Sequence, residues 1–491
     1  MATNNATTKE VSDPSRWGLS AAVVADLGQR LSEFWQRFRG CFRSRTRDTS
    51  ENAHLYLRAQ LTLETERNFA NMERRVQGGD GQALQHFMSN APWQGQAVFQ
   101  QIQSELKGRT ELKQGAVLIL DESPDEKAGT HSVGASRQHN GRQGKVDLCQ
   151  VSTCLAYTHL ALGLWTLVDA ELFLPAEWFT PAFADRRTAL GIPAQRTFAT
   201  KPALGLQMIQ RVKATGLPFE LVACDDLYGR NRALRAALHS EQIAYAAQIP
   251  ADTQVYLEPP RVGLPRRRKA RGPRPKRLRV LSRTQPTEVR ALAASSHTTW
   301  QRCVIRPTER GALEADFTWR QVWTLTAEMV VRAEWLLIRR DLSGRLTYSL
   351  LNGAADLAPR ILIERSCMRY FVERTLQDAK SEIGWDEFQA QTYRAWEHHL
   401  ALTALALWFV AQTKLDWRLQ YARDPLLLQQ FEMEHLPALS TANVRELLKA
   451  ALPLPQLTPA QATDLVVTHL VNRARSTSSR VNAPRTPNDS S

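Results

Sequence analysis

A series of short apolar segments in the middle of the chain constrains the fold more than any other feature of the sequence. AVLILD (116–121) and FELVACDD (219–226) each have the length of a buried strand, and each ends in acidic residues. Segments with helical spacing alternate with such strands. The predicted elements are strands at 116–121, 145–175 (two strands that join near His159), 219–226 and 243–250, with helices at 201–214 and 231–242. This order predicts an α/β fold with a mixed sheet covered by helices.

Helical spacing predominates on both sides of this segment. Apolar residues recur with a helical period over about 17–106, and two long helices are expected at 359–382 and 388–413. Between the sheet and these helices, residues 251–357 contain several β-like segments. They therefore predict a β-rich insertion attached to the sheet.

Basic residues are concentrated in one part of the chain. The 491 residues include 63 Lys and Arg against 49 Asp and Glu, for a formal net charge of +14. Residues 261–283 contain eleven of these cations, no acid, and several Pro and Gly, so a loop is predicted. We expect this basic segment to bind phosphates of nucleic acid or another anionic surface; a solubilising tract is the alternative. Its cations are Arg261, Arg266, Arg267, Arg268, Lys269, Arg271, Arg274, Lys276, Arg277, Arg279 and Arg283.

Other features of the sequence exclude several classes of protein. Six scattered Cys without a CxxC pair argue against a zinc knuckle or a disulfide framework and fit a reducing cytoplasm. The longest apolar run, 400–411, is shorter than the ~20 residues of a membrane span, so a buried helix in a soluble protein is expected. The sequence has no GxxxxGK[ST] motif, so ATP is not an expected ligand.

Two predicted strands end in candidate catalytic acids. Asp121 closes the first strand and Asp225 closes 219–226, which places both at the carboxyl edge of the sheet. If the strands are neighbours, the two carboxylates face each other and imply a divalent cation between them. The alternative is that each acid begins a loop or caps the next helix.

The predicted helix at 359–382 supplies a third group. Arg369, Glu373 and Lys380 are separated by four and seven residues, so one helical face presents all three. Alone, this pattern is typical of a solvated face with an ion pair. Together with Asp121 and Asp225, it predicts a third carboxylate flanked by two cations that bind phosphate.

These motifs, in this order, resemble the DDE transposases of bacterial insertion sequences. The similarity includes DDLYGR after the second acidic strand and R-x3-E-x6-K in the late helix, as in the branch with a Y-x2-R-x3-E-x6-K signature. It extends from about residue 50 to about 415. The resemblance implies a ribonuclease-H-like core that an insertion interrupts before the last catalytic helix.

The resemblance also implies roles for single residues. Asp121, Asp225 and Glu373 match the catalytic triad that binds two Mg²⁺ ions, with Mn²⁺ as a substitute. Arg369 and Lys380 match the positions that contact DNA phosphates. The Tyr of the signature falls on Ser366, which can bond a phosphate but cannot reach as far or stack.

The implied reaction is cut-and-paste transposition. The expected partners are double-stranded DNA, as terminal inverted repeats and target, and a second copy of the chain on that DNA, in the bacterial cytoplasm at the nucleoid. In this branch the DNA end passes through a hairpin, so an aromatic residue of the insertion is expected to receive a flipped base. Trp319, Trp323 and Trp335 are candidates, and the alternative is that they form the core of the insertion. Two other functions remain open: an impaired or domesticated copy that binds DNA without cutting it, and a nuclease that hydrolyses without joining.

Five regions follow from these patterns. An Arg-rich and aromatic-rich run at 34–47 is either a DNA-recognition element or the outer face of a scaffold helix. Tails rich in Ser, Thr, Asn and Pro, at 1–15 and 474–491, are expected to be disordered. The predicted regions are a helical DNA-binding region (1–112), the first part of the ribonuclease-H-like core (113–250), the β-rich basic insertion (251–357), the final core helices (358–415) and a helical C-terminal region with its tail (416–491).

Overall fold

The computed structural model describes residues 13–76, 78, 80–141, 143–265, 275–308, 311–354, 356–388, 391–421, 424–430, 438–452, 463, 467 and 471. Most of the two predicted tails lies outside the described residues. Residues 13–15, expected in the first tail, instead contribute to the short helix η1 (Pro14–Trp17) and its cap. Six cations of the basic segment also lie outside the described residues: Arg266, Arg267, Arg268, Lys269, Arg271 and Arg274.

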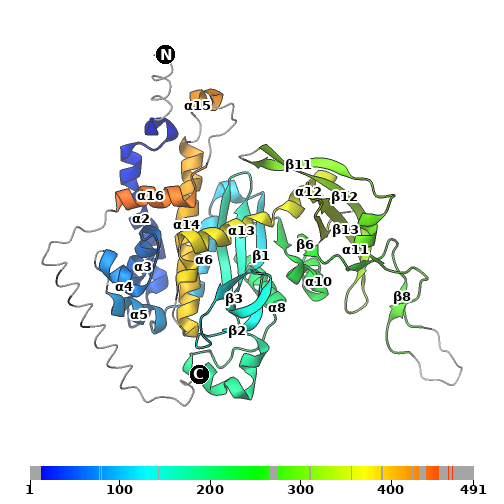
Figure 1. Ribbon diagram of the computed structural model, residues 1–491, viewed down its shortest axis with the longest axis horizontal. Helices are drawn as coiled ribbons and strands as arrows, with labels where there is room; N and C mark the ends of the chain where they lie inside the picture. Colours follow the sequence, from blue (N-terminus) through cyan, green and yellow to red (C-terminus); the bar gives the residue numbers. More distant parts are fainter. Residues whose placement is uncertain are drawn as a thin grey trace.

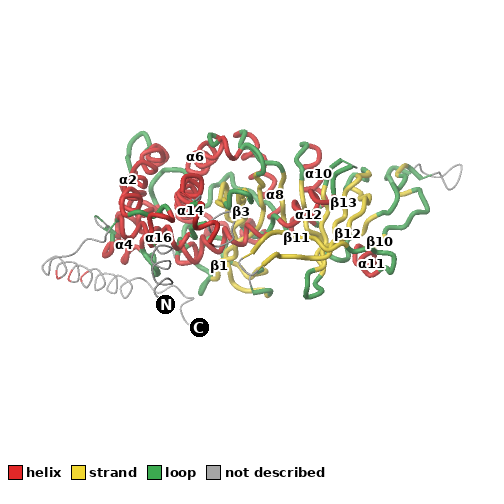
Figure 2. Tube along the Cα trace, turned by 90° about the horizontal axis from the view of Figure 1, so that it is seen from above, coloured by secondary structure: helices red, strands yellow, loops and turns green. Residues whose placement is uncertain are grey.

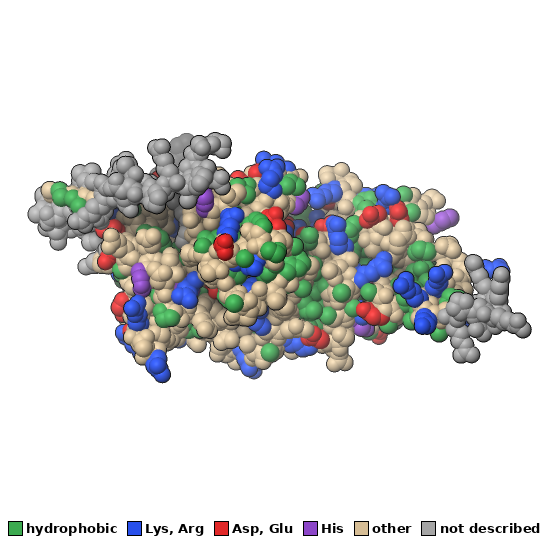
Figure 3. Space-filling model, turned by 90° about the horizontal axis from the view of Figure 1, so that it is seen from below, with side chains coloured by type: hydrophobic (Ala, Val, Ile, Leu, Met, Phe, Trp, Pro, Cys, Tyr) green, Lys and Arg blue, Asp and Glu red, His purple; other side chains and the backbone are tan. Residues whose placement is uncertain are grey.

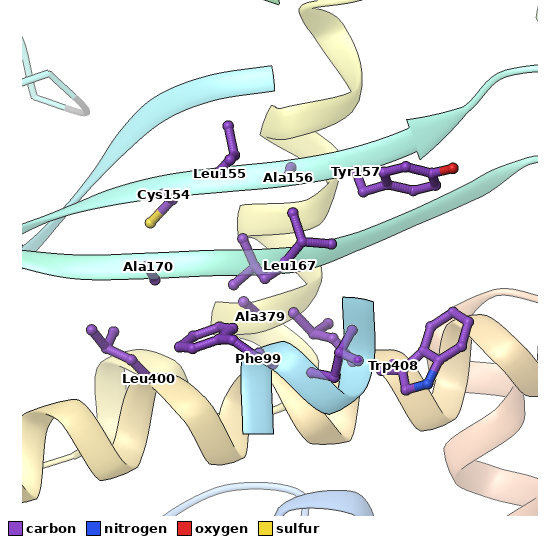
Figure 4. Packing of buried hydrophobic residues seen from close by; sticks show 14 of the residues in the cluster. Phe99, Cys154, Leu155, Ala156, Tyr157, Leu167, Ala170, Ala379, Leu400 and Trp408 are labelled. Carbon is purple, nitrogen blue, oxygen red and sulfur yellow. The ribbon is translucent and has the colours of Figure 1, made fainter. Parts of the chain in front are cut away.

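Helices form one end of the elongated molecule, as predicted for the N-terminal part of the chain (Figure 1). The longest of them, α14 (Tyr393–Tyr421), runs along this helical end and packs against the sheet. Figure 4 shows Leu400 and Trp408 of α14 with Phe99 of α6 below the strands. The other helices at this end are α2 (Ala21–Phe38), α3 (Ser50–Thr62), α4 (Phe69–Arg75), α5 (Gly81–Ser89), α6 (Gly95–Lys107), α15 (Pro425–Gln430) and α16 (Thr441–Ala451).

A ten-stranded sheet occupies the rest of the molecule (Figures 1 and 2). Its strands β1, β5 and β6 are parallel and the other pairs are antiparallel, so the predicted mixed sheet is confirmed. The order is β11-β12-β13-β14-β6-β5-β1-β3-β2, with β4 also paired to β3. The strands are β1 (Ala116–Glu126), β2 (Ser136–Asn140), β3 (Lys145–His159), β4 (Leu164–Phe173), β5 (Leu221–Cys224), β6 (Tyr245–Ile249), β11 (Gln301–Thr308), β12 (Gly311–Leu325), β13 (Val331–Arg340) and β14 (Leu346–Leu351).

Strands from the predicted insertion extend this same sheet. β14 pairs with β6, so β11 to β14 continue the sheet away from the helical end. Two small ribbons lie beside them: β7 (Gln254–Val255) with β10 (Thr287–Glu288), and β8 (Val262–Gly263) with β9 (Arg279–Val280). The short helix α11 (Val289–Ala294) packs near β10.

Helices cover both faces of the sheet. On the face of Asp121 lie α12 (Pro359–Cys367), α13 (Tyr370–Gln377) and α14. Leu120, the neighbour of Asp121, points to the opposite face. There it meets Gly205 of α8 (Lys201–Thr215), and α10 (Arg232–Ser240) covers the same face.

The prediction of one continuous helix over 359–382 is wrong. The chain leaves α12 at Cys367, restarts as α13, and continues as a π-helical turn, η6 (Asp378–Glu382). In η6 the Ile383 amide donates to the Asp378 carbonyl at 3.2 Å, a bond across five residues instead of four. Apolar spacing continues across both breaks, so periodicity could not detect them.

The helix predicted at 388–413 begins and ends later, as α14. The Thr392 hydroxyl accepts from the Ala395 amide at 3.3 Å, which is the bond of an N-terminal cap and explains the later start. None of the helices in the described part of the chain combines the length and apolarity needed to cross a membrane.

Candidate active site

Asp121 and Asp225 lie side by side at the carboxyl edge of two parallel strands. β1 and β5 are neighbours, and their last paired residues are Leu120 and Cys224, each directly before one of the acids. Both acids line one cavity of about 650 Å³. Both acids therefore lie where the parallel pairing ends, but the prediction that the first strand closes at Asp121 is wrong, because β1 continues to Glu126 in its pairing with β3.

Asp225 also serves as a helix cap, which was the alternative interpretation of this residue. Its carboxylate accepts from the amides of Leu227 and Tyr228, at 3.0 and 3.3 Å. The adjacent Asp226 is not among the cavity-lining residues and pairs with Arg230 at 2.8 Å. The capping bonds fix the carboxylate of Asp225 toward the cavity, whereas Asp226 belongs to a surface ion pair.

Close packing behind Asp225 holds its turn in place. Helix α9 (Asp226–Gly229) follows Asp225 directly and packs on β6. A Cβ atom at Gly229 would collide with the carbonyl oxygen of Gln248, so only glycine fits this contact. Arg235 of α10 holds the end of α9 against the sheet. It donates to the Gly229 carbonyl and pairs with the buried Glu334 of β13 at 3.2 Å.

Glu373 reaches the site through Arg369. The Arg369 guanidinium donates to Asp121 at 3.0 Å and to Glu373 at 2.6 Å, so one side chain bridges the two acids. Glu373 lies in the first turn of α13 and lines the same cavity as Asp121 and Asp225. The three predicted acids therefore share one cavity, with a cation between two of them.

Electrostatics of the pair Asp121 and Asp225 favour a bound cation. Burial and the nearby Asp225 raise the pKa of Asp121 to about 7, against a lowering by Arg369. Burial also raises the pKa of Asp225, against its backbone hydrogen bond. Like charges in a partly desolvated site are costly, and a cation relieves that cost.

Asp121, Asp225 and Glu373 supply the carboxylate oxygens typical of a divalent-metal site, and Arg369 occupies the space between two of them. Among the described residues, no three His, Cys, Asp or Glu side chains converge on a single ion position. The Arg369 guanidinium stands between the Asp121 and Glu373 carboxylates and so acts as a stand-in cation. Carboxylate oxygens are the ligands that Mg²⁺ prefers.

Lys380 lines the other end of the cavity. It lies in the π-helical turn η6, and its Nζ donates to the Pro124 carbonyl at 2.8 Å. Sequence reasoning also missed Lys201, which does not line the cavity but pairs at 2.5 Å with Glu122, a cavity-lining neighbour of Asp121. A single lysine at the start of a helix gives no signal in the sequence that would identify it.

Ser366 does not line the cavity. Its hydroxyl donates to the Ile363 carbonyl at 2.8 Å within α12. Sequence reasoning missed Tyr370, the first residue of α13, whose side chain is 40% exposed. Its place directly after Arg369, three residues before Glu373, is the signal that could have identified it.

The three candidate tryptophans lie on one face of the sheet, and it is the face of Asp121. Directly paired residues on neighbouring strands point to the same face. Trp319 and Trp323 flank Gln321, the partner of Trp335 on β13. A row of paired residues connects this face to β1: Trp335, Leu351, Ala246, Ala223 and Ile119.

The same tryptophans are half-buried. Trp319 and Trp335 pack against the main core, and the Trp335 indole N–H donates to the Ala354 carbonyl at 2.9 Å. The carboxylate cavity does not include them. Their part in holding a flipped base therefore stays a prediction.

The described part of the basic segment lies far from the carboxylates. Lys276 and Arg277 are exposed next to the β8–β9 ribbon, at the end of the molecule opposite the helices (Figure 1). Figure 3 shows Lys and Arg side chains gathered at this end. The described cations of the basic segment and the three acids thus lie in separate parts of the molecule.

His398 and His399 are buried inside the helical end. His398 contacts the carbonyls of Met88 and Trp93, both at 2.8 Å. His399 contacts the Trp385 carbonyl at 2.9 Å and the Tyr56 hydroxyl at 3.2 Å. Neither histidine faces the carboxylate cavity.

Comparisons with known proteins agree with this geometry. A family profile described as "DDE superfamily endonuclease" matches residues 37–312, a range that contains Asp121 and Asp225 and stops before Glu373. The chain is also 24% identical over 350 residues to a probable transposase for insertion sequence element IS701 from Microchaete diplosiphon, covering 70% of this chain and 78% of that protein. The resemblance derived from the motifs is thereby confirmed: the chain belongs to the DDE endonuclease superfamily.

Proposed function

We propose that this chain is a transposase that cuts DNA at the ends of an insertion sequence and joins those ends to target DNA. The observation that carries the proposal is the bridge from Arg369 to Asp121 and Glu373 beside Asp225. The Arg369 guanidinium already pairs with acids from two distant parts of the chain. These acids line the cavity where we propose that a DNA strand binds. Similarity to a probable transposase supports the same reaction.

The three acids would hold two Mg²⁺ ions, or Mn²⁺ in their place. Bound there, such ions activate a water molecule or a 3′-hydroxyl group and stabilise the leaving oxygen of the phosphodiester. Asp121 and Asp225 supply oxygens from the strand edge, and Glu373 supplies them from α13. The cut-and-paste sequence of steps belongs to this proposal.

Cations around the cavity position the DNA. Arg369, once released from the two acids, can form a bidentate pair with the phosphate next to the scissile bond. Lys380, at the other end of the cavity, holds a second phosphate of the same strand. The basic segment clamps DNA further from the site, where its affinity is independent of sequence and sensitive to salt.

Two copies of the chain would act together on DNA, at the bacterial nucleoid in the cytoplasm, because two transposon ends must be cut and joined as a pair. Each copy supplies one set of acids. The tryptophans share the sheet face of Asp121, which supports a contact with a distorted DNA end. They remain the candidates for a flipped base.

The test is a cleavage assay on the terminal inverted repeats of the element, with Mg²⁺ or Mn²⁺. Asp225→Asn is expected to slow cutting about 100-fold or more because it removes a charge that acts in the transition state. Asp226→Asn is the matched control, since Asp226 neighbours the same turn but pairs with Arg230 at the surface. Both variants are expected to bind the DNA as the unchanged chain does.

The products distinguish the alternative functions. Hairpins and joined products support a transposase. Binding without nicks in either metal would instead indicate a chain that has lost cutting and acts only as a DNA-binding protein. Nicks without joined products would indicate a hydrolytic nuclease. Equal cutting by Asp225→Asn and Asp226→Asn would contradict the assignment of the acids.

A further inference from the structure

The π-helical turn η6 carries Lys380 to the catalytic cavity. The turn follows α13 directly, and Lys380 at its centre donates to the Pro124 carbonyl at 2.8 Å. π-helical turns are rare, because they replace the usual helical bonds with a wider ring, and they occur frequently at functional sites. Contacts from outside the helix must therefore hold η6 in this form.

The first anchor of η6 is Asp378. This side chain is 7% exposed, and its Oδ2 accepts from the Trp165 indole N–H at 2.9 Å and from the Thr441 hydroxyl at 2.6 Å. The Lys414 amine lies 3.9 Å from the centre of the Trp165 ring. A buried carboxylate with two donors and a nearby cation is firmly fixed.

The second anchor is Glu382, at the end of the turn. Its carboxylate accepts from Arg445 at 2.7 Å, and its backbone carbonyl accepts from Arg67 at 2.7 Å. Gly384 has a φ of 80°, and a Cβ atom there would lie 2.6 Å from Cδ of Arg67. The Arg67 side chain therefore packs where only glycine leaves room.

Both anchors connect to the C-terminal helix α16. Thr441 and Arg445 are four residues apart, so they lie on one face of α16, and they are 4% and 5% exposed. Asp378 and Glu382 have the same spacing on η6. Arg445 also donates to the Leu61 carbonyl at 3.2 Å, which ties α16 to the end of α3.

We propose that α16 is a positioning element of the active site: Thr441 and Arg445 hold the two ends of η6 and thereby fix Lys380 at the catalytic cavity. The inference rests on the proposed function, because it assigns Lys380 to DNA held for cutting. Thr441 and Arg445 touch no reacting group themselves. They act through Lys380.

A double-mutant cycle tests this role. Thr441→Val removes the hydroxyl that holds Asp378 and is expected to slow cutting of end DNA about tenfold, the effect of one lost buried hydrogen bond. In a Lys380→Ala background the same change is expected to have no further effect. Thr441→Ser keeps the hydroxyl and should restore cutting, and Glu446→Gln, an exposed position on the same helix, is the matched control. If Thr441→Val slows cutting by the same factor in the unchanged chain and in the Lys380→Ala background, the proposal is overturned.

Amide hydrogen exchange of the DNA-free protein supplies a second readout that does not depend on cutting. Thr441→Val is expected to raise exchange in 378–384 about tenfold, because the turn loses an anchor, while Glu446→Gln leaves it unchanged. Unchanged exchange in Thr441→Val would overturn the positioning role even if the protein cuts DNA. If the unchanged chain fails to cut the ends of its own element, the proposed function is overturned instead. The hydrogen-exchange result would still show whether Thr441 anchors η6.

Discussion

The Arg369 guanidinium lies 3.0 Å from the Asp121 carboxylate, although 248 residues separate the two in sequence. The same side chain donates to Glu373 at 2.6 Å. An internal cation thus neutralises two of the three acids. On the proposed function, a metal ion bound between these acids would displace Arg369, which would then be available for a phosphate.

Replacement of Arg369 by Ala should separate metal binding from cutting. Without the competing guanidinium, Ca²⁺ is expected to bind the DNA-free protein about tenfold tighter, a coupling of ordinary size for two ligands of one site. Cutting of end DNA is expected to fall, because the phosphate loses its partner. Calorimetry with Ca²⁺ measures the first effect, and Arg374→Ala, on the same helix, is the control. Weaker Ca²⁺ binding in Arg369→Ala would argue against the stand-in role.

Tyr370 is expected to contact DNA directly. It lies seven residues before the cavity-lining Gln377, two helical turns away, so both point to the same side of α13. Tyr370→Ala should weaken binding of end DNA about tenfold in Ca²⁺, the loss of one base–aromatic contact, whereas Tyr370→Phe keeps the ring and most of the affinity. Fluorescence anisotropy measures both. Equal affinity of the Ala variant and the unchanged chain would remove Tyr370 from the DNA surface.

A single methyl group at Gly229 should displace Asp225. The new Cβ atom would collide with the Gln248 carbonyl, so the turn after β5 must shift or the protein must lose stability, at a cost of about 1–3 kcal/mol. Gly229→Ala is therefore expected to lower both the melting temperature and the cutting rate. Gly40→Ala, where no atom lies within 4 Å and φ is not positive, is the control for adding a methyl group at a glycine. A Gly229→Ala protein that cuts at the normal rate would show that the contact does not position Asp225.

The sequence permitted prediction of the sheet and of the meeting point of two acids. AVLILD and FELVACDD are apolar enough to be central strands, and parallel neighbours bring their last residues to one edge. The late helix was predicted as continuous because apolar spacing continues across it. Its π turn is held by partners such as Thr441, which lie far along the chain. Contacts of that kind leave no local pattern.

Side-chain contacts were the least predictable part of the site. The spacing of Arg369 and Glu373 predicts a shared helical face, but it carries no information on the third partner, Asp121. Ser366 was predicted near DNA from the signature, whereas its hydroxyl is bonded within α12. An exposed aromatic residue, Tyr370, instead follows Arg369 directly in the chain.

Acid should weaken the helical end through His399. Burial lowers the pKa of His399 to about 3 from 6.5, so below pH 6.5 the unfolded chain binds a proton that the folded chain does not. Stability is therefore full above pH 6.5 and falls toward pH 3, by about 2 kcal/mol at pH 5 from this residue. Urea unfolding at pH 7 and pH 5 measures the loss. His399→Gln cannot take up the proton and should reduce the difference, and an unchanged difference would assign the loss to other groups.

The central claim is that Asp121, Asp225 and Glu373, from three distant parts of the chain, hold the same metal ions. Iron-mediated cleavage of the polypeptide tests it most directly: Fe²⁺ replaces Mg²⁺, and ascorbate with peroxide then cuts the backbone beside the bound iron. Cuts are expected near residues 121, 225 and 373, all suppressed by excess Mg²⁺ and all lost in Asp121→Asn. Cuts at only one of these places, or cuts that persist in Asp121→Asn, would contradict a shared metal site.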